Sequence, residues 1–368
     1  MMDPAAAPPT TPAEPPPPPV AGLVSVTIVI HNGAREVAQA IDSVLGQNYP
    51  TVEVIAVDDG STDGTWDVLQ SYGSRIRAVR QRNGGLPVAR NTGLRHARGE
   101  FIALMDHDDL CMPERLSVQV AFLRTHPEVG LCGSDFSAFN ENGPIEPSHI
   151  ATYYSQYARV QGRPEALYPH SDTLDISPCL PQPPALPCLV ETYKGDVYER
   201  IACGNFVHPP TVMVRAEVLR RAGIFDPDAR TMCDWDWLVR VAHVTHIGHI
   251  HRALLDYRRS ATQMSAPEQR PRGSLDAFHV ARRIRKSDPT LMRRCGPAFM
   301  EMLGRSATDA AYANAEVDPF LALRCLGLAV FCYQVVNTTG LRALVRALLP
   351  NELLNLIRRF KPAGTRRT

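Results

Sequence analysis

The sequence lacks the features that would tie the protein to nucleic acid or carry it through a membrane. Its 368 residues have a formal net charge of +1, which gives no general attraction to a polyanion. The most apolar stretch, residues 320–336, is interrupted by Arg324 and is shorter than the about 18 to 20 apolar residues of a spanning helix. We therefore expect neither nucleic-acid binding nor a transmembrane helix.

Cysteine pairs and cofactor-binding loops are also missing. The nine cysteines are scattered and include no Cys-x-x-Cys, and residues 1–20 have neither the basic start nor the apolar stretch of a secretory signal. Both observations predict reduced thiols and a cytoplasmic location. No Gly-x-Gly-x-x-Gly follows the first predicted strand and no Gly-Lys-Ser/Thr is present, which argues against a nicotinamide-dependent dehydrogenase and a P-loop enzyme.

Composition divides the chain into three parts. Residues 1–21 are rich in Pro and Ala and are predicted to be disordered, because they cannot bury enough apolar surface to offset the entropy of ordering. Residues 22–260 are predicted to be one α/β domain, and residues 261–368 a helical extension. Within the domain, residues 140–200 lose all periodicity and are predicted to be an insertion or a long loop.

Short runs rich in Val and Ile predict buried strands, and amphipathic segments between them predict helices. The alternation indicates a mostly parallel sheet flanked by helices. Strands are expected at residues 23–30, 52–57, 76–79, 101–105, 129–133 and 211–214, with a further strand ending near Tyr257. Helices are expected at residues 34–46, 66–72, 87–97 and 216–222, from Pro113 to near His126, and from near Asp234.

Acidic residues follow two of the predicted strands. Asp58 and Asp59 end the second strand, and Asp106, Asp108 and Asp109 come directly after the fourth. Ligands of parallel sheets bind at the carboxyl ends of strands, so both clusters should lie at one ligand-binding edge. Neighbouring carboxylates repel unless a cation lies among them, and hard oxygen ligands suit Mg²⁺ or Mn²⁺. The alternative for each cluster is an acidic turn that caps the following helix.

A possible phosphate contact lies between these two clusters in the sequence. Residues 83–93 combine a Gly-Gly turn with the start of a helix, and Arg90 lies one turn into that helix. A guanidinium at this position would pair with phosphate. The alternative is an ion pair with one of the aspartates at the sheet edge.

Eight segments carry a resemblance to a known family: residues 23–32, 58–65, 89–93, 106–109, 112–116, 204–215, 223–226 and 233–240. Taken in order, they resemble the family 2 glycosyltransferases of GT-A fold. The resemblance covers about residues 22–260 and implies a Rossmann-like, nucleotide-sugar-binding domain with a helical C-terminal extension.

The resemblance implies roles for the residues at motif positions. Asp59, with Asp58 beside it, matches the aspartate that contacts the nucleotide base of the donor, and Arg90 matches the basic residue of an Ala-Arg-Asn motif. Asp106 and Asp108 match the Asp-x-Asp motif that holds ribose, diphosphate and metal. Asp109, next to them, is a further candidate metal ligand. Mg²⁺ or Mn²⁺ is the implied cofactor.

Asp234 matches the Glu-Asp motif that supplies the general base in this family, with helix capping as the alternative role. The implied reaction is an inverting, metal-dependent transfer of a hexosyl group from a nucleoside-diphosphate sugar to a glycan or lipid-linked acceptor. The implied pathway makes cell-surface polysaccharide or glycoconjugate. Residues 140–200 would then lie on the acceptor side.

The chain departs from the family at two motif positions. Val29-Ile30-His31-Asn32 stands where the family often has Pro-x-Tyr-Asn, which puts the base contact and the identity of the nucleotide in doubt. Cys233 replaces the Glu of Glu-Asp.

Two other functions are compatible with such a sheet. A sugar-nucleotide nucleotidyltransferase would need a phosphate loop after the first strand, and residues 31–35 match one poorly. A non-catalytic GT-A protein is mildly favoured by Cys233. The presence of Asp106, Asp108 and Asp234 argues against it.

The C-terminal stretch is amphipathic and basic. Residues 341–360 carry four Arg side chains and one acid, Glu352, and Lys361 follows directly. This pattern predicts either a peripheral contact with the anionic cytoplasmic face of a membrane or a helix that packs on the domain with a solvated Arg face.

Overall fold

The computed structural model describes residues 19–182, 186–260 and 270–349. The first half of its sheet is built around β1 (Val20–Ile30), which lies parallel between β2 (Val52–Asp58) and β4 (Gly99–Asp106). β3 (Arg77–Arg80) extends this half beyond β2. Residues 23–30 of β1 are all buried, as expected for a parallel strand covered on both faces.

The second half of the sheet mixes strand directions. The order across the sheet is β3-β2-β1-β4-β10-β6-β11-β9-β8. β6 and β11 run parallel to each other and in the direction of β1 to β4, whereas β10 is antiparallel to both of its neighbours. The predicted mostly parallel sheet flanked by helices is confirmed. The strands of this half are β5 (Leu110–Cys111), β6 (Val129–Asn140), β7 (Gly143–Glu146), β8 (His170–Asp175), β9 (Leu189–Gly195), β10 (Met213–Arg215) and β11 (His246–Arg258).

The joint between the two halves is short. β10 pairs with β4 only at residues 101–103 and with β6 only at residues 131–132. Beyond these positions, toward the carboxyl ends of β4 and β6, a 3-10 turn at Pro209–Thr211 lies between the two strands. Thr211 fixes this turn, because its hydroxyl accepts a hydrogen bond from Ser134 N and its carbonyl accepts one from Gln119 Nε2.

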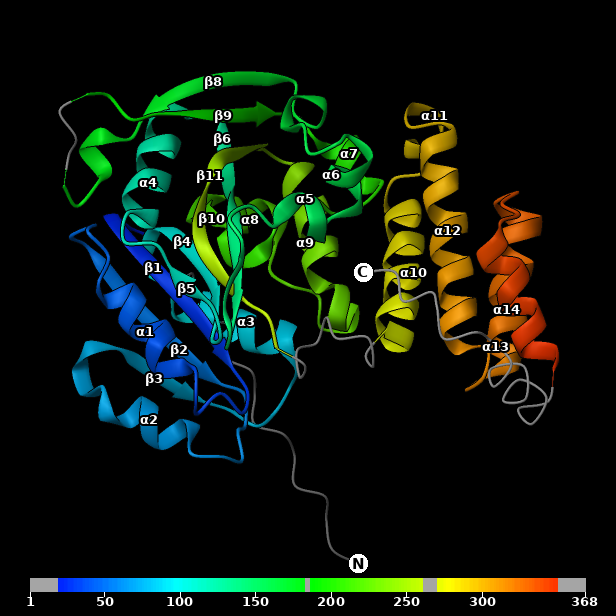
Figure 1. The fold of residues 1–368 in the computed structure, drawn as a ribbon, viewed down its shortest axis with the longest axis horizontal. Coiled ribbons are helices and arrows are strands. Elements are labelled where there is room, and N and C mark those ends of the chain that lie inside the picture. The colour runs from blue at the N-terminus through cyan, green and yellow to red at the C-terminus, as the bar shows by residue number, and fades with distance from the viewer. Residues whose placement is uncertain (1–18, 183–185, 261–269, 350–368) are drawn as a thin grey trace, which may run out of the picture.

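Helices connect the strands and cover the sheet (Figure 1). The expected helix from Pro113 begins two residues later, at Arg115, because residues 113–114 form a turn. The helices of the α/β part are α1 (Val37–Leu45), α2 (Thr65–Ser71), α3 (Leu86–His96), α4 (Arg115–Thr125), α5 (Ile150–Tyr153), α6 (Ser155–Arg159), α7 (Tyr198–Ala202), α8 (Ala216–Ala222) and α9 (Cys233–Ala242).

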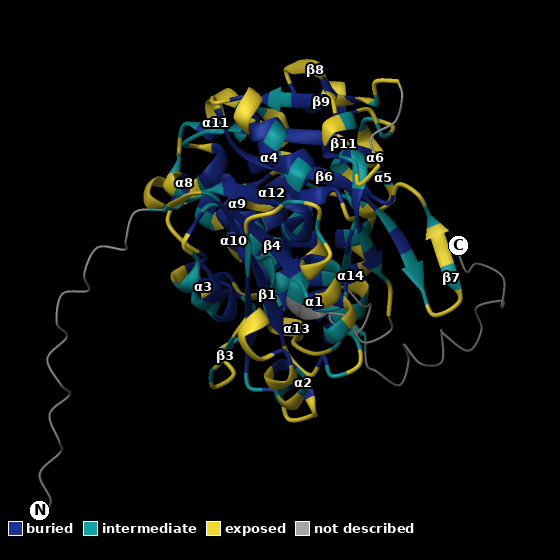
Figure 2. Ribbon diagram, turned by 90° about the vertical axis from the view of Figure 1, so that its left-hand side faces the viewer, coloured by how far each residue is buried: buried dark blue, intermediate teal, exposed yellow. Residues whose placement is uncertain are grey.

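Residues 140–200, expected to be an insertion or long loop, contain regular structure. They contribute β7, β8 and β9 to the sheet and form the short helices α5 and α6. Five of the six residues of β8 are exposed, so the strand has no apolar periodicity that a sequence pattern could detect. Figure 2 shows the mostly exposed β8 beside β9, and the partly exposed β7, which pairs with the end of β6.

The C-terminal region is helical, as expected, over its described residues. α10 packs against α9, against residues 227–232 and against α12. On its other sides α12 packs against α13 and α14. None of the helices in the described ranges combines the length and the apolar character needed to cross a bilayer. The elements are α10 (Arg270–Ser287), α11 (Leu291–Arg294), α12 (Pro297–Asn314), α13 (Pro319–Gly327), a π-helical turn at Leu328–Cys332 and α14 (Thr338–Leu348).

Close packing at Gly248 yields a test of the fold. A Cβ at Gly248 of β11 would lie 2.4 Å from Cε1 of the fully buried Phe122, so Gly248→Ala forces a shift in the core. We expect the free energy of unfolding to fall by about 1–3 kcal/mol, measured by urea denaturation.

Gly327→Ala at the end of α13 is the matched control. A Cβ there meets nothing within 4 Å, so we expect a gain of about 0.5–1 kcal/mol from the lost flexibility of the unfolded chain. Equal changes in the two variants would contradict the packing described for Gly248.

Candidate active site

The loops after β1 and β2 are joined by hydrogen bonds. Asn32 adopts a left-handed conformation, with φ of 54°, that asparagine tolerates better than most residues. Its backbone N–H donates to Ser61 Oγ at 2.9 Å, and its side-chain oxygen accepts from Thr62 N at 2.9 Å. Gly33 N donates to Thr65 Oγ1 at 2.9 Å. Of the two residues that depart from the family pattern, Val29 lies in β1 and His31 lies in this loop, which is fixed to the loop after β2.

Asp59 is buried, and its carboxylate is occupied by its own chain. It accepts hydrogen bonds of 2.8 Å from Gln81 Nε2, Gly84 N and Gly85 N. Three donors on one carboxylate fix the Gly-Gly turn from which α3 starts. The predicted contact of Asp59 with a nucleotide base stays a prediction, since the structure shows it shaping this turn.

Asp58 has a similar internal role. Its Oδ1 accepts from Ser61 N at 2.8 Å, and its Oδ2 lies 3.1 Å from Arg80 Nε. The carboxylate is fully buried, so it is not open to a ligand in this arrangement.

The acidic turn after β4 is held by the end of β11. Asp109 is buried, and its Oδ1 accepts from Arg258 N at 3.0 Å. Arg258 Nε donates to the carbonyl of Asp108 at 2.8 Å. Burial, followed by the charges of Asp108 and Asp106, raises the pKa of Asp109 well above its usual range. The pKa of Asp106 is also raised, because burial and Asp108 outweigh the opposing Arg90.

Arg90 joins the acidic turn to α9. Its side chain is only 4% exposed; Nη1 donates to Asp234 Oδ1, and Nη2 lies 3.4 Å from Asp106 Oδ1. The guanidinium also lies over the ring of Phe225, 5.3 Å from its centroid. One buried cation therefore connects the carboxylate predicted to hold the donor with the carboxylate predicted to be the base.

Asn91 explains how these distant segments meet. Its side-chain amide donates to Phe225 O and accepts from Phe225 N, both at 2.8 Å. This reciprocal pair fixes the 223–226 segment against α3. The segment leads through residues 227–232 into α9, whose first turn carries Asp234.

The surroundings of Asp234 separate its two predicted roles. The N-cap of α9 is Met232, without a side-chain hydrogen bond, and the carboxylate of Asp234 pairs with Arg90. Helix capping is therefore not what this side chain does. Cys233, in place of the family's Glu, is buried 3.9 Å from Arg90 Nη1, and burial raises the pKa of its thiol to about 11. The neutral thiol adds no charge beside Asp234.

A cluster of six aromatic rings borders the same edge, and sequence reasoning missed it. His208 stacks on Phe136 at 4.0 Å, and its Nδ1 lies 3.1 Å from the hydroxyl of Tyr154. Burial lowers the pKa of His208 well below its usual range, so the ring is neutral. Burial and Tyr153 raise the pKa of Tyr154; the charge of Asp106 raises it further, and the charge of Arg90 opposes the rise. His149 and Tyr257 complete the cluster.

The acidic turn fits a metal that arrives with a ligand. Over residues 19–182, 186–260 and 270–349, no three His, Cys, Asp or Glu side chains converge into a metal-binding group. Asp106 and Asp108 are partly exposed and offer hard oxygen ligands at a strand end. Mg²⁺ is commonly held by one or two carboxylates together with substrate phosphates. The donor set suits such shared coordination, and the buried Asp109 is the least accessible of the three.

The fold and this edge define the class of protein. A mostly parallel sheet with aspartates at the ends of β2 and β4 and a further carboxylate on α9 is a GT-A arrangement. The chain is similar to Staphylococcus aureus TarS residues 1–349, with a TM-score of 0.54 and 16% identity over 93% of both chains. It is also similar to the mannosyltransferase PcManGT of Pyrobaculum calidifontis, with a TM-score of 0.51 and 19% identity over 91% of this chain and 87% of that one.

The sequence comparisons point to the same family. Residues 25–178 match the family model described as glycosyl transferase family 2, which confirms the predicted resemblance over that part of the chain. An uncharacterized glycosyltransferase of Rickettsia typhi is 27% identical over 236 residues, 64% of each chain. The Bacillus subtilis protein EpsE, described as a glycosyltransferase, is 40% identical over 33% of this chain and 45% of its own length. The matches thus span less than two thirds of these relatives.

The bridging role of Arg90 can be tested by stability. Arg90→Met leaves Asp106 and Asp234 without their shared cation, so we expect the free energy of unfolding at pH 7 to fall by about 3 kcal/mol in urea denaturation. The double variant Arg90→Met with Asp234→Asn should lose less than Arg90→Met alone, because one uncompensated charge is removed. Arg95→Met, at an exposed position of α3, is the control. Equal losses at positions 90 and 95 would refute the bridge.

Proposed function

We propose that the protein is an inverting glycosyltransferase that transfers a hexosyl group from a nucleoside-diphosphate sugar to a hydroxyl of a glycan or lipid-linked acceptor. The proposal rests on one observation: at the carboxyl edge of the sheet, Asp106 and Asp234 both form ion pairs with Arg90. A relative 41% identical over 105 residues is named for teichuronic acid biosynthesis. That name supports a role in making cell-surface polysaccharide or glycoconjugate.

The donor would lie along the edge formed by β2 and β4. Asp59, with the buried Asp58 beside it, would contact the nucleotide base, and Asp106 and Asp108 would contact the ribose and diphosphate. Mg²⁺ or Mn²⁺ would be held by Asp106 and Asp108, with the buried Asp109 behind them. When bound, the ion would neutralise charge on the leaving diphosphate. The similar mannosyltransferase was solved with GDP-Man and Mn²⁺, which supports this assignment.

Asp234 would act as the general base. As an acceptor hydroxyl attacks the anomeric carbon, its proton passes to Asp234, the bond to the diphosphate breaks, and the configuration inverts. Phosphate and carboxylate compete for guanidinium groups. We therefore expect the diphosphate of the donor to draw Arg90 away from Asp234, which frees the base only when a donor is in place.

The acceptor would approach between the aromatic cluster and α9. Residues 140–200 supply His149, Tyr153 and Tyr154 to that cluster, which supports their assignment to the acceptor side of a catalytic domain at residues 22–260. Residues 261–368 would be the helical extension of this division, and their described part, residues 270–349, is helical. A lipid-linked acceptor would require a peripheral position at the cytoplasmic face of a membrane. The basic segment first suggested for this contact, residues 341–360, is described only to residue 349.

A donor panel tests the proposal. Nucleoside-diphosphate sugars with Mg²⁺ or Mn²⁺ should raise the melting temperature of the protein, because ligand at about 100 times Kd stabilises the folded state by about 2.7 kcal/mol. At least one donor should be hydrolysed or transferred. If no donor shifts the melting temperature, the proposal fails. Pyrophosphate release from a nucleoside triphosphate and a sugar phosphate would instead indicate a nucleotidyltransferase, and donor binding without turnover a non-catalytic protein.

The base is tested by Asp234→Asn. We expect transfer to fall by about 10²- to 10⁴-fold, since the amide cannot accept the acceptor's proton, while the thermal shift with donor persists. Asp228→Asn, at an exposed position before α9, is the matched control and should keep full activity. Full activity of Asp234→Asn would remove Asp234 as the base.

A further inference from the structure

The last described helices expose an unusual number of large apolar side chains. Nine of the sixteen large hydrophobic residues that are exposed in the described chain lie within residues 317–348. The outer apolar face is defined here by Phe320, Phe331, Leu341, Val345 and Leu348, with the two Phe side chains 87% and 85% exposed. It is carried by α13, the π-helical turn and α14, which lie on the side away from the sheet (Figure 1). Such a concentration marks an interaction surface.

The helix α14 exposes its apolar stripe, whereas an ordinary surface helix packs its apolar stripe against the core. Its residues Leu341, Val345 and Leu348, spaced by four and three, form an apolar stripe that is exposed. The side that packs on the bundle uses small residues, Gly340 and Ala343, and a Cβ at Gly340 would lie 3.2 Å from Thr308 Cγ2. The apolar stripe of α14 is therefore directed at something other than the described core.

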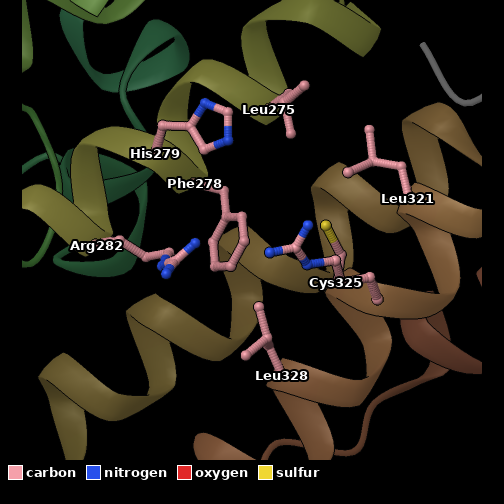
Figure 3. Close-up of a pocket in the computed structure, with 8 residues that line it drawn as sticks. Leu275, Phe278, His279, Arg282, Leu321, Cys325 and Leu328 are labelled. Atoms are coloured by element: carbon pink, nitrogen blue, oxygen red, sulfur yellow. The ribbon is translucent and has the colours of Figure 1, made fainter.

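The chain from α13 into the π-helical turn combines aromatic rings with a cation. Phe320, Arg324 and Phe331 are all exposed, and Phe320 and Arg324, four residues apart in α13, lie on one side of that helix. Arg324 also lines a small pocket with residues of α10. Figure 3 shows Phe278 and Arg282 of α10 at this pocket. The pocket measures about 90 Å³, too little for a nucleotide. The open face is therefore the candidate binding surface.

Charge indicates which partner the face fits. Residues 317–349, which carry the face, contain Arg324, Arg342 and Arg346 against the single acid Asp318. Arg342 of α14 is exposed beside the apolar stripe. A second copy of this face would bring a like charge and be repelled. An anionic bilayer has an apolar interior and negatively charged head groups, so it matches both the exposed apolar side chains and the Arg side chains beside them.

We propose that the outer apolar face rests on a bilayer containing anionic phospholipid, with Phe320 and Phe331 among the acyl chains and Arg324 and Arg342 at the head groups. This inference rests on the proposed function, in which a lipid-linked acceptor requires a peripheral position at the membrane, and it names the surface that would make the contact. It assigns the contact to α13 and the π-helical turn as well as to α14. The earlier expectation concerned residues 341–360 alone.

The test is co-sedimentation of the full chain with vesicles of phosphatidylcholine containing about 30% phosphatidylglycerol. We expect binding that weakens with salt and is much lower for pure phosphatidylcholine. The variant Phe320→Ser with Phe331→Ser should bind about tenfold or more weakly, because both insertions are lost. Arg324→Glu with Arg342→Glu should also weaken binding. Leu186→Ser with Leu189→Ser, at exposed positions of the α/β part, should bind like the unchanged protein.

Two outcomes overturn the inference. The first is an unchanged chain that does not bind the anionic vesicles, or a Phe320→Ser, Phe331→Ser variant that binds them equally well. The second is a dimer in vesicle-free solution, seen by sedimentation velocity, that this variant converts to monomer, since the face would then join two copies. The donor thermal shift separates the two proposals. Donor binding without vesicle binding contradicts only this inference, and vesicle binding without donor binding contradicts only the transferase.

Discussion

The geometry of the candidate site depends on one buried guanidinium. Arg90 is almost wholly removed from water, and a charge in that position requires partners of opposite sign. Its partners come from the end of β4 and the first turn of α9, which are far apart in the sequence. Asn91 fixes the intervening segment to the same helix. The Ala-Arg-Asn motif is thus the point at which the strand half and the α9 half of the site are joined.

Much of the fold follows from apolar periodicity, and the exceptions have physical causes. β1, β2 and β4 are covered on both faces, so their runs of Val and Ile identify them. β8 and β9 lie at the far edge of the sheet, and β8 has a single buried side chain, Leu174. The Pro-rich composition around them resembles a loop. Strand pairing there is carried by backbone hydrogen bonds, which residue identity does not reveal.

The site shows a similar division. Aspartates at strand ends could be located because parallel strands bring their carboxyl ends to one edge. Of their partners, only Arg90 was foreseen, because an ion pair with a strand-end aspartate was one of its two predicted roles and the structure shows it with Asp106. Arg258 reaches the acidic turn from the end of β11. His208, Phe136 and Tyr154 are in contact although each comes from a different segment of the chain. No spacing in the sequence records these contacts. The internal hydrogen bonds of Asp58 and Asp59 likewise become visible only when the loops around them are in place.

The short β10 has a consequence for how such a protein can diversify. Because this strand stops well below the carboxyl ends of β4 and β6, the two strands are not joined by ladder hydrogen bonds where substrates would lie. The space is filled by a turn and by side chains such as His208. Side chains in this space, such as His208, can be exchanged without breaking the hydrogen bonds between paired strands, whereas Thr211 must be kept because its hydroxyl accepts from Ser134 N of β6. The short β10 thus separates the variability of the side chains at this edge from the stability of the sheet.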